Sequence, residues 1–282
     1  MDAGESGPDP MSLALRISEG ITRDARIYKP ATEGKGRRMD DVLKTHIDGL
    51  DTILGGGIPK GHLVLVCGTP GTMKSTLCFT TMYHNAAHGG KGLYISLEQD
   101  GESFLRSMKK LGMAEADERV HVLDLAMLRR ELGEKEKQKD WASMLLDVTR
   151  HAVQEDRYGM VTIDSLEAFY ALAELANPRR EMFHLFTRIK ELGVTTFFIS
   201  EIPIGERQLT KYGEDFLTDG ILLLEHFDVG ETDVQLRIRC VKMREMSQQH
   251  GYFAVNHNGS RFLVSQVLSH RRRRGEDSED KR

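Results

Sequence analysis

The chain has 282 residues, 39% hydrophobic and 29% charged, which is typical of a soluble globular protein with a full-sized core. Its formal net charge of −4 argues against a generally basic nucleic-acid-binding surface. No stretch approaches 18 consecutive apolar residues, and the N-terminus lacks the basic start and apolar run of a secretory signal. We therefore expect a cytoplasmic protein without a membrane segment. The three cysteines form no Cys-x-x-Cys pair, so we expect buried thiols rather than disulfides or a zinc site.

The composition divides the chain into three regions. Residues 1–40 are rich in glycine, proline and charge, and we expect a flexible N-terminal arm. Residues 269–282 contain four consecutive arginines followed by mostly acidic residues. This pattern predicts a disordered, solvated tail, with contact to an anionic partner as the alternative. Residues 41–268 remain as the folded domain.

Within this domain, apolar runs of strand length alternate with amphipathic stretches. The predicted strands are residues 62–68, 92–98, 119–125, 159–165 and 194–201. The predicted helices are residues 75–90, 102–112, 141–154 and 179–193. In the second helix, Phe104, Leu105, Met108 and Leu111 are expected on one face; in the third, Trp141, Leu145, Val148 and Ala152. The alternation predicts an α/β fold with a mostly parallel central sheet and helices on both faces.

The last third of the domain changes character. Residues 220–227, 233–245 and 251–264 read as consecutive strands without helices between them. The Asn258-Gly259 pair is a strong hairpin signal. An antiparallel extension is therefore predicted to finish the sheet. Residues 128–140 read as a solvated helix or loop without assignable chemistry.

The stretch GTPGTMKS follows the first predicted strand and resembles the phosphate-binding pattern G-x-x-x-x-G-K-[ST]. Such a loop converges backbone N–H groups and a helix N-terminus on phosphate oxygens, with a lysine for charge and a hydroxyl for Mg²⁺. The alternative is a chance glycine-rich turn before a core helix. The candidate nucleotide-binding residues are Gly68, Thr69, Pro70, Gly71, Thr72, Met73, Lys74, Ser75 and Thr76.

Met73 departs from the pattern, because it stands where the second glycine is expected. Glycine there permits close approach or a positive φ, which methionine tolerates poorly. With a negative φ, methionine would cost little and could point away from the phosphates.

Carboxylates at the ends of other predicted strands support the same site. Asp164 ends an apolar strand, as expected of a group that orients Mg²⁺, although an Asp-Ser pair is also good helix-capping chemistry. Glu98 ends the strand after the loop helix, where it could polarise an attacking water; a surface acid is the alternative. Ser200 and Glu201 end the fifth strand at the same edge and could sense the γ-phosphate.

The ordered motifs GTPGTMKST, LYISLEQ, VTIDS, VTTFFISE, KYGEDFLTDG and RIRCVKMRE resemble the KaiC-like branch of the RecA-type P-loop ATPases. The resemblance runs from about Lys44 to Val264 and covers one ATPase module. It implies a RecA-like fold that binds ATP and Mg²⁺ between subunits of a ring, commonly a hexamer. The self-phosphorylation of clock proteins belongs to a second module and is not carried over.

The resemblance also assigns roles to residues. It implies that Lys74 neutralises phosphate charge, that Ser75 and Asp164 serve the metal, and that Glu98 is the catalytic base. Family members follow this base with a second glutamate, whereas this chain has Gln99. The trans-acting residues it implies are Lys242 and Arg244 as catalytic groups, with Ser247 and Gln248 extending the nucleotide contact. Without the resemblance, Lys242 and Arg244 would read as solvated edge charges.

These motifs are compatible with three functions. The leading one is a Mg²⁺-ATP-dependent oligomeric ATPase, slow and regulatory. The second is a recombinase-like DNA-repair paralogue, for which residues 202–212 are a weakly basic candidate loop. The third is a module in which bound ATP, without turnover, controls assembly with another protein; Met73 and Gln99 favour it.

Overall fold

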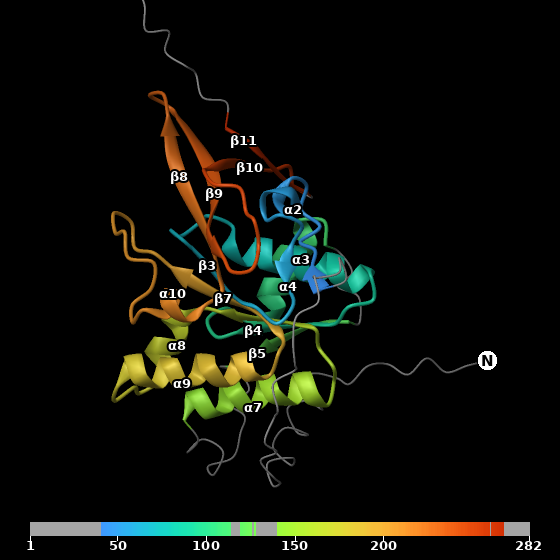
Figure 1. The fold of residues 1–282 in the computed structure, drawn as a ribbon, viewed down its shortest axis with the longest axis vertical. Coiled ribbons are helices and arrows are strands. Elements are labelled where there is room, and N and C mark those ends of the chain that lie inside the picture. The colour runs from blue at the N-terminus through green and yellow to red at the C-terminus, as the bar shows by residue number, and fades with distance from the viewer. Residues whose placement is uncertain (1–40, 114–118, 126, 128–139, 260, 268–282) are drawn as a thin grey trace, which may run out of the picture.

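The computed structural model describes residues 41–113, 119–125, 127, 140–259 and 261–267 (Figure 1). The predicted arm, the predicted tail and nearly all of residues 128–140 lie outside the described residues. The domain boundaries therefore stay predictions.

A nine-stranded sheet in the order β11-β10-β9-β8-β3-β7-β6-β4-β5 forms the centre of the structure. Its strands are β3 (Leu63–Gly68), β4 (Gly92–Ser96), β5 (Val120–Asp124), β6 (Met160–Asp164), β7 (Thr195–Glu201), β8 (Gly220–Val229), β9 (Asp233–Met243), β10 (Phe253–His257) and β11 (Phe262–Gln266). From β8 to β5 all neighbouring strands are parallel, and the last three strands are antiparallel. The predicted α/β class with a C-terminal antiparallel extension is confirmed.

Helices cover both faces of the parallel strands (Figure 1). On one face lie α3 (Lys74–Ala87) and α4 (Gly101–Lys110); on the other lie α7 (Trp141–Gln154), α8 (Leu166–Leu172) and α9 (Pro178–Glu191). Every residue of β3 is buried, and alternate side chains of this strand enter two separate cores. This is why the strand reads as a continuous apolar run.

The predicted helix faces are mostly confirmed. All four stripe residues of α7 are buried, as are Phe104 and Met108 of α4. Leu111, which follows α4, is half-buried. Leu105 is exposed by 37%, because it points away from the sheet one position after Phe104. Within the described residues, no helix is long and apolar enough to cross a membrane.

The C-terminal extension contacts the N-terminal segment of the domain. This segment contains β1 (Val42–Leu43), α2 (Leu50–Ile53) and β2 (Ile58–Pro59), none of which was predicted. The predicted hairpin exists as β10 and β11, and Gly259 in its turn has a φ of 92°. Val264 of β11 donates its N–H to the carbonyl of Asp48 at 2.8 Å. Part of the exposed edge of β11 is thereby paired.

All three cysteines are free and buried, as expected. Burial raises the pKa of the Cys67 thiol to about 12 and that of Cys240 to about 11, and it also raises the pKa of Cys78. These thiols are packing groups and are not ionised near neutral pH.

Asp219 fastens four elements together at the amino-terminal edge of β3. Its carboxylate accepts hydrogen bonds from the Leu63 N–H at 3.0 Å, from Lys190 of α9, and from Arg244 at 3.3 Å. Burial alone would raise the pKa of Asp219, but the bonds from Lys190 and Leu63 and the lysine's charge hold it below its usual value. The carboxylate therefore stabilises the fold in its ionised form.

We expect Asp219→Asn to lower the free energy of unfolding at pH 7 by about 1–3 kcal/mol, because a charged, bonded acceptor is lost. A carboxyl with a depressed folded pKa stabilises above its unfolded pKa, and this contribution disappears as pH falls through the folded pKa. The difference between wild type and variant should therefore shrink below about pH 4. Urea unfolding across pH 3–7 measures it. Asp228→Asn, at an exposed position of β8, the strand that follows Asp219, is the control; a pH-independent difference would contradict the assignment.

Candidate nucleotide-binding site

The loop between β3 and α3 has a backbone that its glycines make possible. A Cβ atom on Gly68 would lie 2.2 Å from the carbonyl oxygen of Leu224 in β8, so only glycine fits there. Gly71, at the exposed tip beside Pro70, has a φ of 81°. The buried Thr72 donates its hydroxyl hydrogen to the Thr69 carbonyl at 2.7 Å, which closes the loop on itself.

Met73 adopts the left-handed conformation, with φ 63° and ψ 27°. The alternative of a negative φ at this position is therefore wrong. A non-glycine residue in this region is strained by roughly 1–2 kcal/mol. Its carbonyl accepts the N–H of Leu77 at 2.9 Å and so begins α3. The backbone takes the shape that glycine would give, and the thioether side chain packs against the core beneath the loop.

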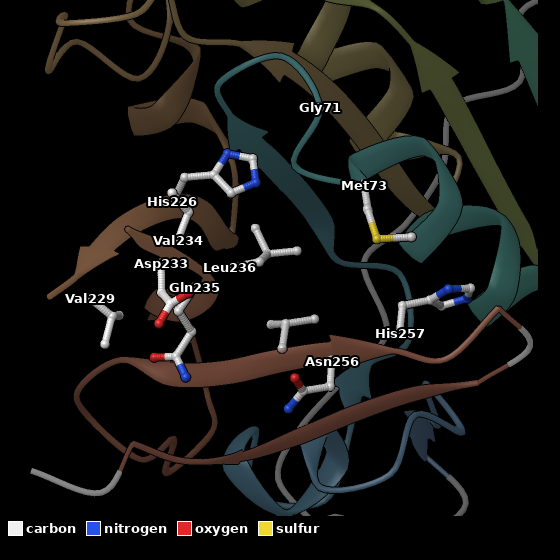
Figure 2. A pocket seen from close by; sticks show the side chains of 11 residues that line it. Gly71, Met73, His226, Val229, Asp233, Val234, Gln235, Leu236, Asn256 and His257 are labelled. Carbon is white, nitrogen blue, oxygen red and sulfur yellow. The ribbon is translucent and has the colours of Figure 1, made fainter. Parts of the chain in front are cut away.

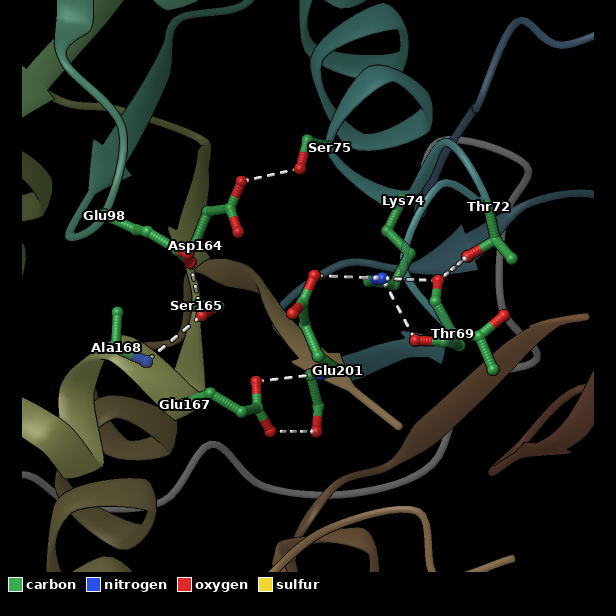
Figure 3. Close-up of polar contacts among 12 residues, drawn as sticks. Thr69, Thr72, Lys74, Ser75, Glu98, Asp164, Ser165, Glu167, Ala168 and Glu201 are labelled. Carbon is green, nitrogen blue, oxygen red and sulfur yellow. Dashed lines mark hydrogen bonds and ion pairs between the residues drawn. The ribbon is translucent and has the colours of Figure 1, made fainter. Parts of the chain in front are cut away.

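Lys74 points into the loop it follows and is buried, with 5% of its side chain exposed. Its ammonium group donates to the carbonyls of Gly68 and Thr69, both at 3.0 Å (Figure 3). It also lies 3.5 Å from a carboxylate oxygen of Glu201, at the end of β7. The next residues, Ser75 and the buried Thr76, belong to the first turn of α3.

The hydroxyl of Ser75 donates to Oδ2 of Asp164 at 2.7 Å, joining α3 to the end of β6 (Figure 3). Tyr94, from the neighbouring strand β4, donates its phenol hydrogen to the same oxygen. Burial raises the pKa of Asp164, while the bonds from Tyr94 and Ser75 and the charge of Lys74 oppose that rise. Burial also raises the pKa of Tyr94, which stays a neutral donor.

An adjacent carboxylate and hydroxyl are the hard oxygen donors that Mg²⁺ prefers, so Ser75 and Asp164 fit this metal. The alternative role of Asp164 as a helix cap is wrong, because Ser165 caps α8 by accepting the Ala168 N–H at 3.2 Å. Within the described residues, no group of three or more His, Cys, Asp or Glu side chains is arranged to hold a metal by itself.

Glu98 lies beyond β4, which ends at Ser96, two residues earlier than predicted. Its side chain is exposed, and Oε2 lies 3.5 Å from the hydroxyl of Ser165 (Figure 3). Gln99 is also exposed, and its N–H donates to the Ser96 hydroxyl at 3.2 Å. Ser96 pairs with Asp164 in the sheet, so Glu98 lies at the same edge as the predicted metal group.

Glu167, in the first turn of α8, was not predicted. Its carboxylate accepts the Ser200 hydroxyl and the Glu201 N–H, both at 2.8 Å (Figure 3). Burial raises the pKa of Glu167. Ser200 is fully buried and bonded in this way, so of the predicted pair only Glu201 faces the loop lysine. No sequence pattern predicts this bond, because it joins residues 33 positions apart.

Lys242 and Arg244 lie at the opposite edge of the sheet from the loop. Lys242 pairs with Ile221 of β8, whereas the loop begins beside Leu224. Met243 is opposite Gly220, and Gly220 to Leu224 spans about 13 Å at about 3.3 Å per residue. These side chains therefore do not reach their own loop.

Contacts at the amino-terminal edge of the sheet hold the side chains of Lys242 and Arg244 in place. Lys242 donates to the Asp215 carbonyl at 2.7 Å, and burial and the charge of Arg244 lower its pKa. Arg244 is 53% exposed and pairs with Asp219. Ser247 and Gln248 follow in a segment that contacts α2, where the Gln249 N–H donates to the Ile53 carbonyl at 2.7 Å.

A pocket of about 620 Å³ opens between the loop and the C-terminal extension (Figure 2). Gly71 and Met73 form its loop side, and strands β8, β9 and β10 form the rest. Its lining combines apolar side chains with polar ones, among them Leu236, Val255, His226, Asn256 and His257. The sequence did not predict this pocket, because its walls come from segments more than 150 residues apart.

Comparison with known proteins places the chain in a family. A model of the KaiC ATPase family matches residues 43–261. A UPF0273 protein of Pyrobaculum aerophilum is 32% identical over 69% of this chain and 71% of its own length. The circadian clock oscillator protein KaiC of a Picosynechococcus species is 28% identical over 77% of this chain, which spans 43% of that protein.

A solved structure of a KaiC-like protein from Pyrococcus horikoshii shares the fold. The TM-score is 0.68 at 23% identity, over 79% of this chain and 98% of the other. The site geometry, the family model and the curated relatives agree with the resemblance seen in the motifs. The chain belongs to the KaiC ATPase family.

Proposed function

We propose that this chain is a slow, regulatory ATPase that binds Mg²⁺-ATP between the subunits of a ring, commonly a hexamer in this family. The observation that carries the proposal is the division of the site between two edges of one sheet. Lys74, Ser75 and Asp164 converge at the carboxyl edge, whereas Lys242 and Arg244 lie at the other.

The loop would bind the phosphates through its backbone. The N–H groups of residues 71–76 and the N-terminus of α3 favour negative charge, and the Lys74 ammonium lies inside the loop. Two carbonyls and Glu201 are its present acceptors, and phosphate oxygens would replace them. Ser75 and Asp164 would hold Mg²⁺, which supplies charge neutralisation on the phosphates when bound.

Hydrolysis requires a base for the attacking water, and Glu98 is our candidate. As water attacks the γ-phosphorus and the bond to the ADP oxygen breaks, the Glu98 carboxylate accepts the water proton. The exposed Glu98 is 3.5 Å from Ser165, a long contact, and its neighbour is the neutral Gln99. A single carboxylate held by one long contact supports the proposal that turnover is slow.

Completion of the site requires a second subunit. Lys242 and Arg244 would approach the γ-phosphate of a neighbour and stabilise the charge that develops there. Asp219 and the Asp215 carbonyl fix both cations at the edge from which they would project. Ser247 and Gln248 continue from the same edge. The pocket beside Met73 would take the nucleoside part of the ligand.

One alternative has specific support, namely ATP-controlled assembly without turnover. The strain at Met73 and the missing second acid at Gln99 both favour it. The loop of residues 202–212 does not support the recombinase alternative. Its charged side chains are two basic groups, Arg207 and Lys211, and one acid, Glu206, which is too little positive charge for a nucleic-acid surface.

The deciding measurement is steady-state phosphate release from Mg²⁺-ATP, with ATP binding measured in parallel. Lys74→Ala should weaken ATP binding by about 10- to 100-fold, because a charged donor is lost inside the loop. Glu98→Gln should keep ATP affinity and lower turnover by about 100-fold or more. Unchanged binding by Lys74→Ala would refute the loop assignment. Equal turnover by wild type and Glu98→Gln would mean either that ATP controls assembly without turnover or that another residue is the base.

Mixed rings test the role of the second edge. Arg244→Ala and Lys74→Ala subunits should each be inactive alone, and mixing them should restore turnover at interfaces where an intact loop faces an intact arginine. For random mixing at equal ratio, about one interface in four is complete. Mixtures no more active than the separate variants would mean that Arg244 does not act in trans. A mixture of Arg237→Ala subunits with Lys74→Ala subunits serves as the matched arginine control.

The strain at Met73 predicts a specific order of stability. Met73→Gly removes roughly 1–2 kcal/mol of strain but gains chain entropy on unfolding, so its free energy of unfolding should stay within about 1 kcal/mol of wild type. Met73→Val, β-branched at positive φ, should be less stable than either. ATP affinity of the glycine variant should equal or exceed that of wild type. Chemical denaturation and ATP titration check both; a glycine variant as unstable as the valine variant would contradict the strain.

A further inference from the structure

Tyr94 contacts the predicted metal group, and the sequence analysis assigned it no role. It lies in the middle of β4, and its ring is fully buried between β4 and α3. The ring stacks on Phe104 at 4.4 Å between centroids and meets the edge of Phe79 at 5.9 Å. A ring held on two sides in this way has little freedom, so its hydroxyl is fixed in position.

Two hydroxyl groups donate to one oxygen of Asp164. Ser75 and Tyr94 both bind Oδ2, and within the described part of the chain no donor is directed at Oδ1. The carboxylate is therefore oriented with one oxygen engaged and the other available. A carboxylate that acts on a metal needs such outer partners to keep its orientation.

The two donors differ in what they can do when a cation binds. The Ser75 hydroxyl is a small rotor, and its oxygen is itself a candidate ligand of the cation. The phenol of Tyr94 comes from a different strand and its ring is locked by Phe104 and Phe79. Only Tyr94 can hold Asp164 without taking part in coordination.

We propose that Tyr94 is a positioning residue that sets the affinity of this ATPase for its divalent cation, by fixing the Asp164 carboxylate from the β4 side. This inference rests on the proposed function, because it assigns the cation to Ser75 and Asp164. The ligand class is a hard divalent cation bound together with a nucleoside phosphate.

The test is Mn²⁺ binding in the presence of ADP, followed by electron paramagnetic resonance of the free ion. Tyr94→Phe keeps the ring and removes only the hydroxyl. The half-saturating Mn²⁺ concentration should rise roughly 10-fold, as is usual for the loss of an outer partner of a metal ligand. ADP affinity measured in EDTA should not change. The matched control is Tyr158→Phe, which removes a buried phenol that lies just before β6 and is bonded to His121 at 2.6 Å.

A double-mutant cycle shows whether Tyr94 acts through Asp164. In an Asp164→Asn background, Tyr94→Phe should produce no further change in Mn²⁺ binding. Phe104→Leu, which keeps the phenol but loosens its ring, should give a smaller rise in the same direction. This second variant also decides the question if Tyr94→Phe does not fold.

The outcomes separate the two proposals. Wild-type protein that binds neither ADP nor Mn²⁺ would overturn the proposed function and this inference with it. Normal binding by wild type, with Tyr94→Phe or Phe104→Leu indistinguishable from it, would overturn the inference alone. An equal loss in Tyr158→Phe would also overturn it, because the effect would then come from general loosening of the fold.

Discussion

The hydrogen bond from Ser75 to Asp164 joins the two halves of the candidate site. One partner begins α3 and the other ends β6, and in the sheet β7 lies between β6 and the strand that leads into α3. The bond therefore depends on the parallel register, which brings the carboxyl ends of these strands to one edge. A slip of one residue in β6 would turn Asp164 to the opposite face and leave the loop without its carboxylate.

The same register separates this edge from Lys242 and Arg244. Because β9 runs antiparallel to β8, its later residues return toward the start of β3. The strand that carries Lys242 thus ends at the edge opposite the loop, and Asp219 fixes that edge to α9. If Lys242 and Arg244 act on a neighbour's γ-phosphate as proposed, a single chain has an incomplete catalytic site. Catalysis would then depend on assembly.

The sequence predicted what depends on short spacing. The buried strand, the loop, Lys74 and Ser75 are contiguous, so one pattern predicted them together, and Asp164 and Glu98 were predicted because polar residues end apolar strands. Tyr94, Glu167 and the pocket were missed, because each depends on a contact across the sheet. In the sequence of a single strand, a tyrosine among apolar residues is typical of a side chain that packs in the core. Only the pairing of β4 with β6 shows that its hydroxyl meets a carboxylate.

Met73 and Asp164 show where this fold departs from local preference. A methionine is held at positive φ, and a half-buried carboxylate lies beside a helix, each at a free-energy cost to folding. Both departures lie within or beside one loop, although His46, Arg157 and Glu245 also have positive φ outside it. Helices α4 and α7 carry ordinary caps at Asp100 and Asp140. Strain persists only where surrounding packing determines it, and here β3, β8 and the core under α3 do so. At the loop, such groups suit a charged ligand, because groups that are already oriented need not reorganise when the ligand arrives.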